Sequence, residues 1–159
     1  KGDCNVSKQD YTYQGISDCN SAALLFGGAN TCKSGCMRLG SCIAVCPVGA
    51  ISKNAEGHIV VDEDACISCE KCTKVCPTGA IRMLYEDSEF VVDCSSHEKG
   101  AVVRSQCSVG CIGCMICQKK FPESGFSVDR FLSSFDQTAS HGQAEQALEA
   151  CPVKVIIKR

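Results

Sequence analysis

Cysteine is the feature that most constrains this chain, because 16 of its 159 residues are cysteine. Many of them are closely spaced, and the most regular run is Cys66, Cys69, Cys72, Cys76 and Pro77. In this C-x2-C-x2-C-x3-C-P spacing, three thiolates bind one [4Fe–4S] cluster, and the fourth, before the proline, binds the other cluster of a pair. The spacing therefore predicts iron–sulfur clusters, and the cysteine count is large enough for four of them.

Two other uses of cysteine compete with this interpretation. A high cysteine content is also typical of secreted, disulfide-rich domains, but those domains rarely repeat C-x-x-C at regular intervals, and the sequence has no signal-peptide pattern. Zinc ribbons use separate C-x2-C pairs, whereas this chain has three cysteines in tandem followed by Cys-Pro. Both alternatives are weaker than iron–sulfur clusters in a reducing compartment.

Composition and charge narrow the class of protein further. With 6 Phe, 3 Tyr and no Trp, the chain has too few aromatic residues for a large aromatic core. We therefore expect clusters to replace the missing apolar volume and the apoprotein to be poorly folded. The formal net charge is −2, and bound clusters add negative charge, so we expect no nucleic-acid partner. No stretch approaches the ~20 apolar residues of a transmembrane helix.

An internal repeat organises the chain. Cys32, Cys36, Cys42 and Cys76 recur 75 residues later as Cys107, Cys111, Cys117 and Cys151. Each copy is expected to contain a cysteine loop, a short helix, a hairpin, a second loop and helix, and a closing strand, which in the first copy includes residues 80–81. The repeat predicts an α+β fold of tandem bacterial ferredoxin-like domains. The expected segments are an N-terminal segment that contributes cysteines (1–31), a two-cluster domain (32–86), a connecting strand segment (87–106) and a degenerate domain (107–159).

The second copy is predicted to be degenerate because it lacks one complete set of cysteines. The counterparts of Cys46, Cys66, Cys69 and Cys72 are Phe121, His141, Ala144 and Ala147. Their joint replacement predicts that the second copy has lost one cluster and kept the other. Residues 143–150 are then expected to form an ordinary helix, and Phe121 to fill the vacated space. Strands are expected within residues 57–64 and 89–93.

Three cluster sites follow from this repeat. Their predicted iron ligands are Cys46, Cys66, Cys69 and Cys72 in one site; Cys32, Cys36, Cys42 and Cys76 in the second; and Cys111, Cys114, Cys117 and Cys151 in the third. The second set is the least regular, because Leu39 stands where the other copy has Cys114. Cys32 is assigned there to replace the missing ligand.

Four dispersed cysteines remain, namely Cys4, Cys19, Cys94 and Cys107. No C-x-x-C pair occurs among them, so spacing alone identifies no site. Three interpretations stay open: buried thiols that pack as small hydrophobic side chains, a fourth [4Fe–4S] cluster, or a zinc site.

Segments outside the ferredoxin loops carry a resemblance to a known family. They are residues 2–5 (GDCN), 11–46 (YTYQGISDCNSAALLFGGANTCKSGCMRLGSCIAVC) and 92–117 (VDCSSHEKGAVVRSQCSVGCIGCMIC). They resemble the long form of the B subunit of the Rnf complex, a membrane-bound ferredoxin:NAD oxidoreductase that couples electron flow to sodium or proton pumping. The resemblance covers nearly the whole chain. It also implies a linked role for Cys4, Cys19, Cys94 and Cys107, which favours a fourth cluster.

The resemblance implies an electron-transfer subunit with no substrate site of its own. It would relay electrons from reduced soluble ferredoxin towards membrane partners, from a peripheral position on the cytoplasmic side of the cell membrane. Family members usually begin with a membrane helix and a further iron–sulfur domain, so we expect this sequence to be a fragment. Many members also keep a full cysteine set in the last unit. The alternatives are a polyferredoxin-like subunit of a hydrogenase or dehydrogenase and, less favoured, a zinc-stabilised interaction module.

Overall fold

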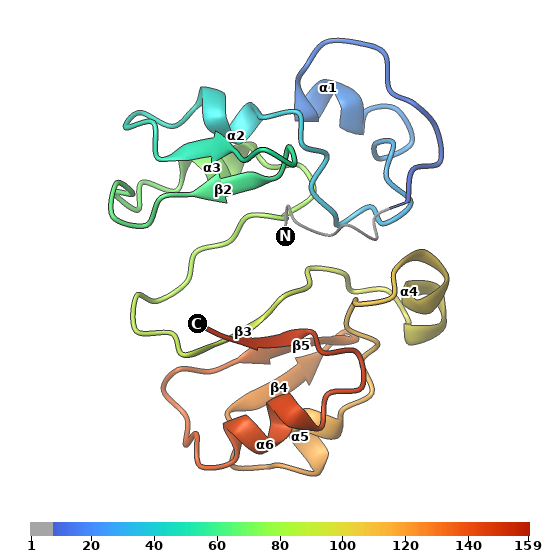
Figure 1. Cartoon of the computed structure of the whole chain (residues 1–159). Coiled ribbons are helices and arrows are strands. Elements are labelled where there is room, and N and C mark those ends of the chain that lie inside the picture. The colour runs from blue at the N-terminus through green and yellow to red at the C-terminus, as the bar shows by residue number, and fades with distance from the viewer. Residues whose placement is uncertain (1–7) are drawn as a thin grey trace. The chain divides into compact units, whose positions relative to one another are not determined.

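A computed structural model describes residues 8–159 of the chain (Figure 1). The chain divides into two compact units, one ending at Met83 and the other running from Leu84 to Arg159. Cys4, one of the four dispersed cysteines considered for a fourth cluster, lies outside the described residues. None of the helices in the described part is long and apolar enough to cross a membrane.

The first unit is built from short elements around its cysteine loops. Helix α1 (Cys19–Ala23) is followed by α2 (Ser41–Ala44), an antiparallel hairpin of β1 (Ile51–Lys53) and β2 (Ile59–Val61), and α3 (Lys71–Val75). Strand β2 lies within the predicted segment 57–64. Gly40 precedes α2 with φ 88°, a left-handed conformation that glycine adopts without steric cost. This turn brings the chain from the first cysteine loop directly into the helix.

The second unit has a similar order of elements. Strand β3 (Phe90–Val92) and helix α4 (Gly100–Gln106) come first, and α5 (Ile116–Lys119), β4 (Phe126–Asp129), β5 (Leu132–Phe135), α6 (Ala144–Glu149) and β6 (Ile156–Lys158) follow. Strands β4 and β5 form an antiparallel hairpin, and β3 pairs antiparallel with β6. The strand within residues 89–93 and the helix within 143–150 that the sequence predicts are therefore confirmed.

The closing strand predicted at residues 80–81 is not formed. Its counterpart at 155–156 leads into β6, where Ile156 pairs with Val92. The two segments differ because a strand needs a neighbouring strand for its backbone hydrogen bonds. In the second unit β3 supplies that neighbour, whereas the described part of the first unit has no strand ahead of its cysteine loop.

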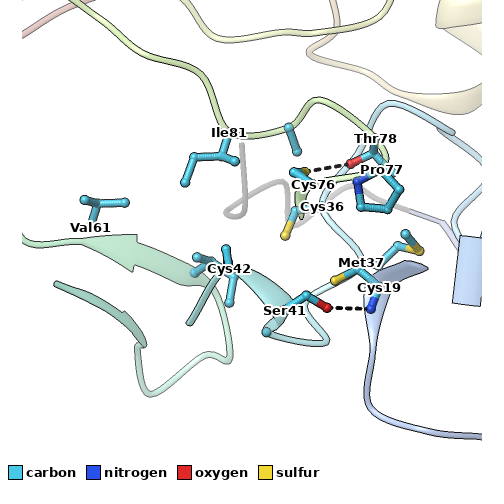
Figure 2. Close-up of a pocket in the computed structure, with 13 residues that line it drawn as sticks. Cys19, Cys36, Met37, Ser41, Cys42, Val61, Cys76, Pro77, Thr78 and Ile81 are labelled. Atoms are coloured by element: carbon cyan, nitrogen blue, oxygen red, sulfur yellow. Dashed lines mark hydrogen bonds between the residues drawn. The ribbon is translucent and has the colours of Figure 1, made fainter. Parts of the chain in front are cut away.

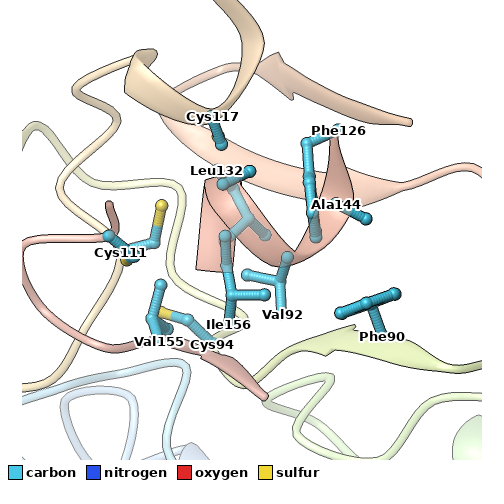
Figure 3. Close-up of a cluster of buried hydrophobic side chains, with 12 residues drawn as sticks. Phe90, Val92, Cys94, Cys111, Cys117, Phe126, Leu132, Ala144, Val155 and Ile156 are labelled. Atoms are coloured by element: carbon cyan, nitrogen blue, oxygen red, sulfur yellow. The ribbon is translucent and has the colours of Figure 1, made fainter. Parts of the chain in front are cut away.

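The core of the second unit is a cluster of buried hydrophobic side chains, among them Phe90 and Phe126 (Figure 3). The rings of these two residues belong to an aromatic cluster. The ring centroid of Phe135 lies 5.4 Å from that of Phe90 and 4.8 Å from that of Phe126. On α6, Ala144 is 1% exposed and Ala147 is fully buried, so these small side chains let the helix lie against the rings. Phe121 packs against the same cluster, as the sequence predicts.

The aromatic residues are unevenly shared between the units. The composition argued against a large aromatic core, yet four of the 6 phenylalanines gather in this one cluster. Phe26 is the only phenylalanine in the sequence of the first unit, and its residue surface is 87% exposed; the two tyrosines of this unit, Tyr11 and Tyr13, are not buried either. The first unit therefore builds no core from aromatic rings, in keeping with a fold that depends on its cysteine sites.

Candidate iron–sulfur sites

Cysteine side chains line three separate cavities, two in the first unit and one in the second. Each cavity has four of them: Cys46, Cys66, Cys69 and Cys72; Cys19, Cys36, Cys42 and Cys76; and Cys111, Cys114, Cys117 and Cys151. None of the fifteen cysteines in residues 8–159 forms a disulfide. Four thiols around one cavity is the donor set of a [4Fe–4S] cluster, so the residues present fit this group at all three places.

The cavity lined by the loop of residues 66–70, the start of α3 and the turn after α2 brings together the four cysteines predicted from the tightest motif. Cys66 and Cys69 come from an exposed loop in which Ser68 and Glu70 have φ values of 53° and 59°. Cys72 lies on α3, whereas Cys46 comes from the turn after α2. The local triplet and the remote Cys-Pro cysteine thus reach one site by different routes, as the two-cluster pattern requires.

Backbone hydrogen bonds favour the thiolate form of the remote cysteine at this site. The backbone N–H of Val48, and to a lesser extent those of Ala50, Gly49 and Ile51, lower the pKa of Cys46, although burial acts in the opposite direction. N–H groups that point at a cysteine sulfur also stabilise the added negative charge of a cluster and raise its reduction potential. The turn after Cys46-Pro47 is therefore suited to hold a negatively charged group.

The site in the second unit contains the set predicted for the degenerate copy. Cys117 lies on α5, and its Sγ is 3.3 Å from Oγ of Ser133 on β5. Burial raises the pKa of both Cys111 and Cys117. Since thiolates are the form that binds iron, loading this site releases protons, and the bound metal offsets the cost of burying negative charge.

The remaining cavity differs from the sequence prediction in one member (Figure 2). Cys36, Cys42 and Cys76 line it as expected, but Cys19 lines it in place of Cys32. Burial raises the pKa of Cys42 to about 11. Burial acts in the same direction on Cys76, but the Thr78 hydroxyl and the backbone N–H groups of Ile81, Ala80 and Thr78 outweigh it and lower the pKa of Cys76.

Two other dispersed cysteines lie in the second unit, and one of them, Cys94, is close enough to Cys111 to interact with it electrostatically. Cys94 is buried in the core of the second unit, where its Sγ accepts a hydrogen bond from the backbone N–H of Ser96 at 3.4 Å. Cys107 caps the C-terminal end of α4 and lines none of the three cavities described above. With Cys4 outside the described residues, a fourth cluster stays a prediction.

The four thiols of each site line a cavity. A structural zinc ion requires four donors that each lie about 2.3 Å from one point when all are sulfur. Among residues 8–159, no three or more His, Cys, Asp or Glu side chains converge closely enough to hold a single metal ion.

Comparison with known proteins first defines the class of this chain. Residues 29–83 match the family model described as a 4Fe-4S dicluster domain. This segment contains eight cysteines, from Cys32 to Cys76, and the fold around them is ferredoxin-like, with short helices and a two-stranded antiparallel sheet. The chain therefore contains a 4Fe–4S dicluster domain.

Three curated relatives define the family more closely. The chain is 40% identical over 146 residues to the B subunit of the ion-translocating oxidoreductase complex of Methanosarcina acetivorans, covering 92% of this chain and 55% of the relative. It is 37% identical to the B subunit of the proton-translocating ferredoxin:NAD(+) oxidoreductase complex of Clostridium ljungdahlii (98% of this chain, 55% of the relative). It is 31% identical to the B subunit of the Na(+)-translocating ferredoxin:NAD(+) oxidoreductase complex of Acetobacterium woodii (98% of this chain, 46% of the relative).

These relatives confirm the resemblance recognised in the sequence. The chain is similar to Rnf-type B subunits over nearly all of its length, and it spans about half the length of the curated relatives it matches. The aligned region covers nearly all of this chain, so it includes both units and the segments around the dispersed cysteines.

Proposed function

We propose that this chain is an electron relay of an Rnf-type ferredoxin:NAD oxidoreductase. It would accept electrons from reduced soluble ferredoxin and pass them towards partner proteins in the membrane, from the cytoplasmic side. The observation that carries the proposal is the presence of three cavities, each lined by four cysteines, in a chain related to the B subunits of such complexes. [4Fe–4S] clusters bound there supply one-electron redox chemistry.

The chain's own residues would hold the clusters and set their surroundings. Cys46 and Cys76 each precede a turn whose backbone N–H groups lower the pKa of that cysteine and so favour its thiolate. The cysteines of the second unit are more enclosed, since Cys111, Cys117 and Cys151 are buried, whereas Cys66 and Cys69 are exposed. Because exposure and N–H···S bonds both tune the potential, the three sites are expected to differ in reduction potential.

The two units support the proposed tandem organisation, with copies at residues 32–86 and 107–159. Helix α5 begins at Ile116, 75 residues after α2 begins at Ser41, and β4 begins at Phe126, 75 residues after β1 begins at Ile51. The same offset relates the cysteine runs. In the second copy, α6 packs its alanines into the aromatic cluster at the position where α3 carries Cys72. We infer that this copy exchanged one cluster for an apolar core.

A redox titration with ferredoxin tests the proposed function. We expect the anaerobically purified, cluster-loaded chain to have lost part of its absorbance at about 400 nm after incubation with reduced ferredoxin and anaerobic separation from it, because its clusters have accepted electrons that the ferredoxin has lost. The control is dithionite, a small reductant that needs no docking surface. Bleaching by dithionite but not by reduced ferredoxin would contradict the proposal and point to a different electron donor.

A further inference from the structure

Helix α1 places a cysteine at an iron–sulfur site to which spacing does not assign it. The cavity lined by Cys36, Cys42 and Cys76 has Cys19 as its fourth cysteine, and Cys32 is not part of its lining. Cys19 lies close enough to both Cys36 and Cys42 to interact with them electrostatically. The space inside the cavity is about 100 Å³, several times what one water molecule needs, so it can admit a group larger than a single ion.

From this geometry we infer that Cys19, and not Cys32, is the fourth iron ligand of this cluster. The inference rests on the proposed iron–sulfur function and changes its ligand set to Cys19, Cys36, Cys42 and Cys76. It also means that a segment outside the dicluster domain of residues 29–83 completes one of that domain's two sites.

Specific hydrogen bonds hold Cys19 at the cavity (Figure 2). Its backbone N–H donates to Oγ of Ser41 at 2.7 Å, and the Ser41 hydroxyl donates to Oδ1 of Asp18 at 2.8 Å. The other carboxylate oxygen of Asp18 accepts from the backbone N–H of Ser21 at 2.7 Å, which caps the N-terminus of α1. Ser41 is only 7% exposed, so this network joins α1 to α2 next to Cys42.

A second contact secures α1 on the side of Cys76. The amide of Asn20 donates to the backbone carbonyl of Val75 at 3.2 Å. Val75 is the last residue of α3 and immediately precedes Cys76. Helix α1 is thus attached to the two segments that supply Cys42 and Cys76, which is the placement a ligand-bearing helix needs.

The second copy argues independently that Cys32 has another role. The counterpart of Cys32 there is Cys107, which does not line the cavity formed by Cys111, Cys114, Cys117 and Cys151. In both copies, therefore, the cysteine four residues before the first ligand lies outside the site. The second copy has Cys114 as its middle ligand, whereas the first has Leu39 at that position, and Cys19 supplies the missing thiol from helix α1.

The assignment also changes the group of dispersed cysteines. If Cys19 binds the cluster of the first unit, the predicted set of Cys4, Cys19, Cys94 and Cys107 cannot hold a cluster of its own. Cys32 then joins Cys4, Cys94 and Cys107 as the cysteines outside the three ligand sets. A fourth cluster would need this different set.

Paired cysteine variants test the inference through iron content and EPR spectra. We expect Cys19→Ser to lose at least one iron per chain, and up to about one third of the total, with a changed EPR signal from one cluster after reduction. Cys32→Ser, the matched control, should keep the iron content and spectrum of the unmutated chain. Unchanged iron in Cys19→Ser, or loss in Cys32→Ser alone, would overturn the inference.

Thiol labelling of the unmutated chain gives a second test that does not depend on how a variant folds. Under anaerobic conditions, iodoacetamide followed by peptide mass spectrometry should modify Cys32 and leave Cys19 protected; both should react after iron is removed with a chelator. Protection of Cys32 with labelling of Cys19 in the loaded chain would refute the assignment. An unmutated chain that contains no iron would instead refute the proposed function, so the two failures can be distinguished.

Discussion

Cys69→Ala should remove one complete cluster from the first unit, or about four of the twelve iron atoms expected per chain. Cys69 is exposed and lies outside the buried core, so its replacement removes a ligand without leaving a cavity in the core. A cluster that loses one of four thiolates in a solvent-accessible loop is poorly retained. Iron and acid-labile sulfide, measured per chain after anaerobic purification, should both fall by about one third.

Cys107→Ala is the matched control for this prediction. It is the same substitution at a cysteine that lines none of the three cavities, so iron and sulfide should equal those of the unmutated chain. If Cys69→Ala retained all its iron, the ligand set of Cys46, Cys66, Cys69 and Cys72 would be wrong. Loss of a whole cluster from Cys107→Ala would instead favour the fourth site predicted from the sequence.

Phe126→Ala should destabilise the second unit by about 3–5 kcal/mol, the usual cost of removing a buried phenylalanine ring. Phe126 is 4% exposed and contacts the rings of both Phe90 and Phe135. This cluster is the apolar core of a unit with one cysteine site, so its loss cannot be compensated by a second cluster. Urea unfolding of the loaded chain, followed by far-UV circular dichroism, should show the transition of this unit at a lower urea concentration.

Phe26→Ala is the control for the core substitution. It removes the same ring, but Phe26 is 87% exposed in the first unit, so the change in unfolding free energy should stay within about 0.5 kcal/mol. The chain has two units and metal sites, and its transitions must therefore be followed separately. Equal effects of Phe126→Ala and Phe26→Ala would show that the aromatic cluster is not the core of the second unit.

Much of the fold was predictable because its signals are local. The strands around residues 57–64 and 89–93 are bounded by turn residues or cysteine loops, and helix α6 lies in a segment of good helix formers. The prediction of a closing strand at 80–81 was wrong, because a strand also depends on a neighbour that local sequence does not reveal. Strand β6 forms in the second unit since β3 lies beside it.

The candidate sites also differ in whether local spacing predicts them or whether they depend on residues far apart in the sequence. Triplets such as Cys66, Cys69 and Cys72 place their thiols through the loop itself, so spacing identifies them and the structure brings them together. Cys19 reaches its cavity through Asp18 and Ser41, which are 23 residues apart and meet only in the folded chain. The Asp18 N-cap signal could have located α1, but nothing in the spacing connects Cys19 with Cys36.

The proposed exchange of a cluster for an apolar core has a consequence for the folding of the second unit. Where α3 carries Cys72, α6 carries Ala147, which is fully buried against the aromatic rings. This part of the second unit is held by apolar burial, which favours folding roughly in proportion to the area removed from water. We therefore expect the second unit to depend less on iron for its folding than the first.

The central claim is that each of the three four-cysteine cavities holds one [4Fe–4S] cluster. The most direct measurement is the iron, acid-labile sulfide and zinc content of the anaerobically purified chain, together with its visible spectrum. We predict about twelve iron and twelve sulfide per chain, with a broad absorbance at about 400 nm. Zinc without that absorbance, or an iron content near eight or sixteen with matching sulfide, would contradict the assignment of three clusters.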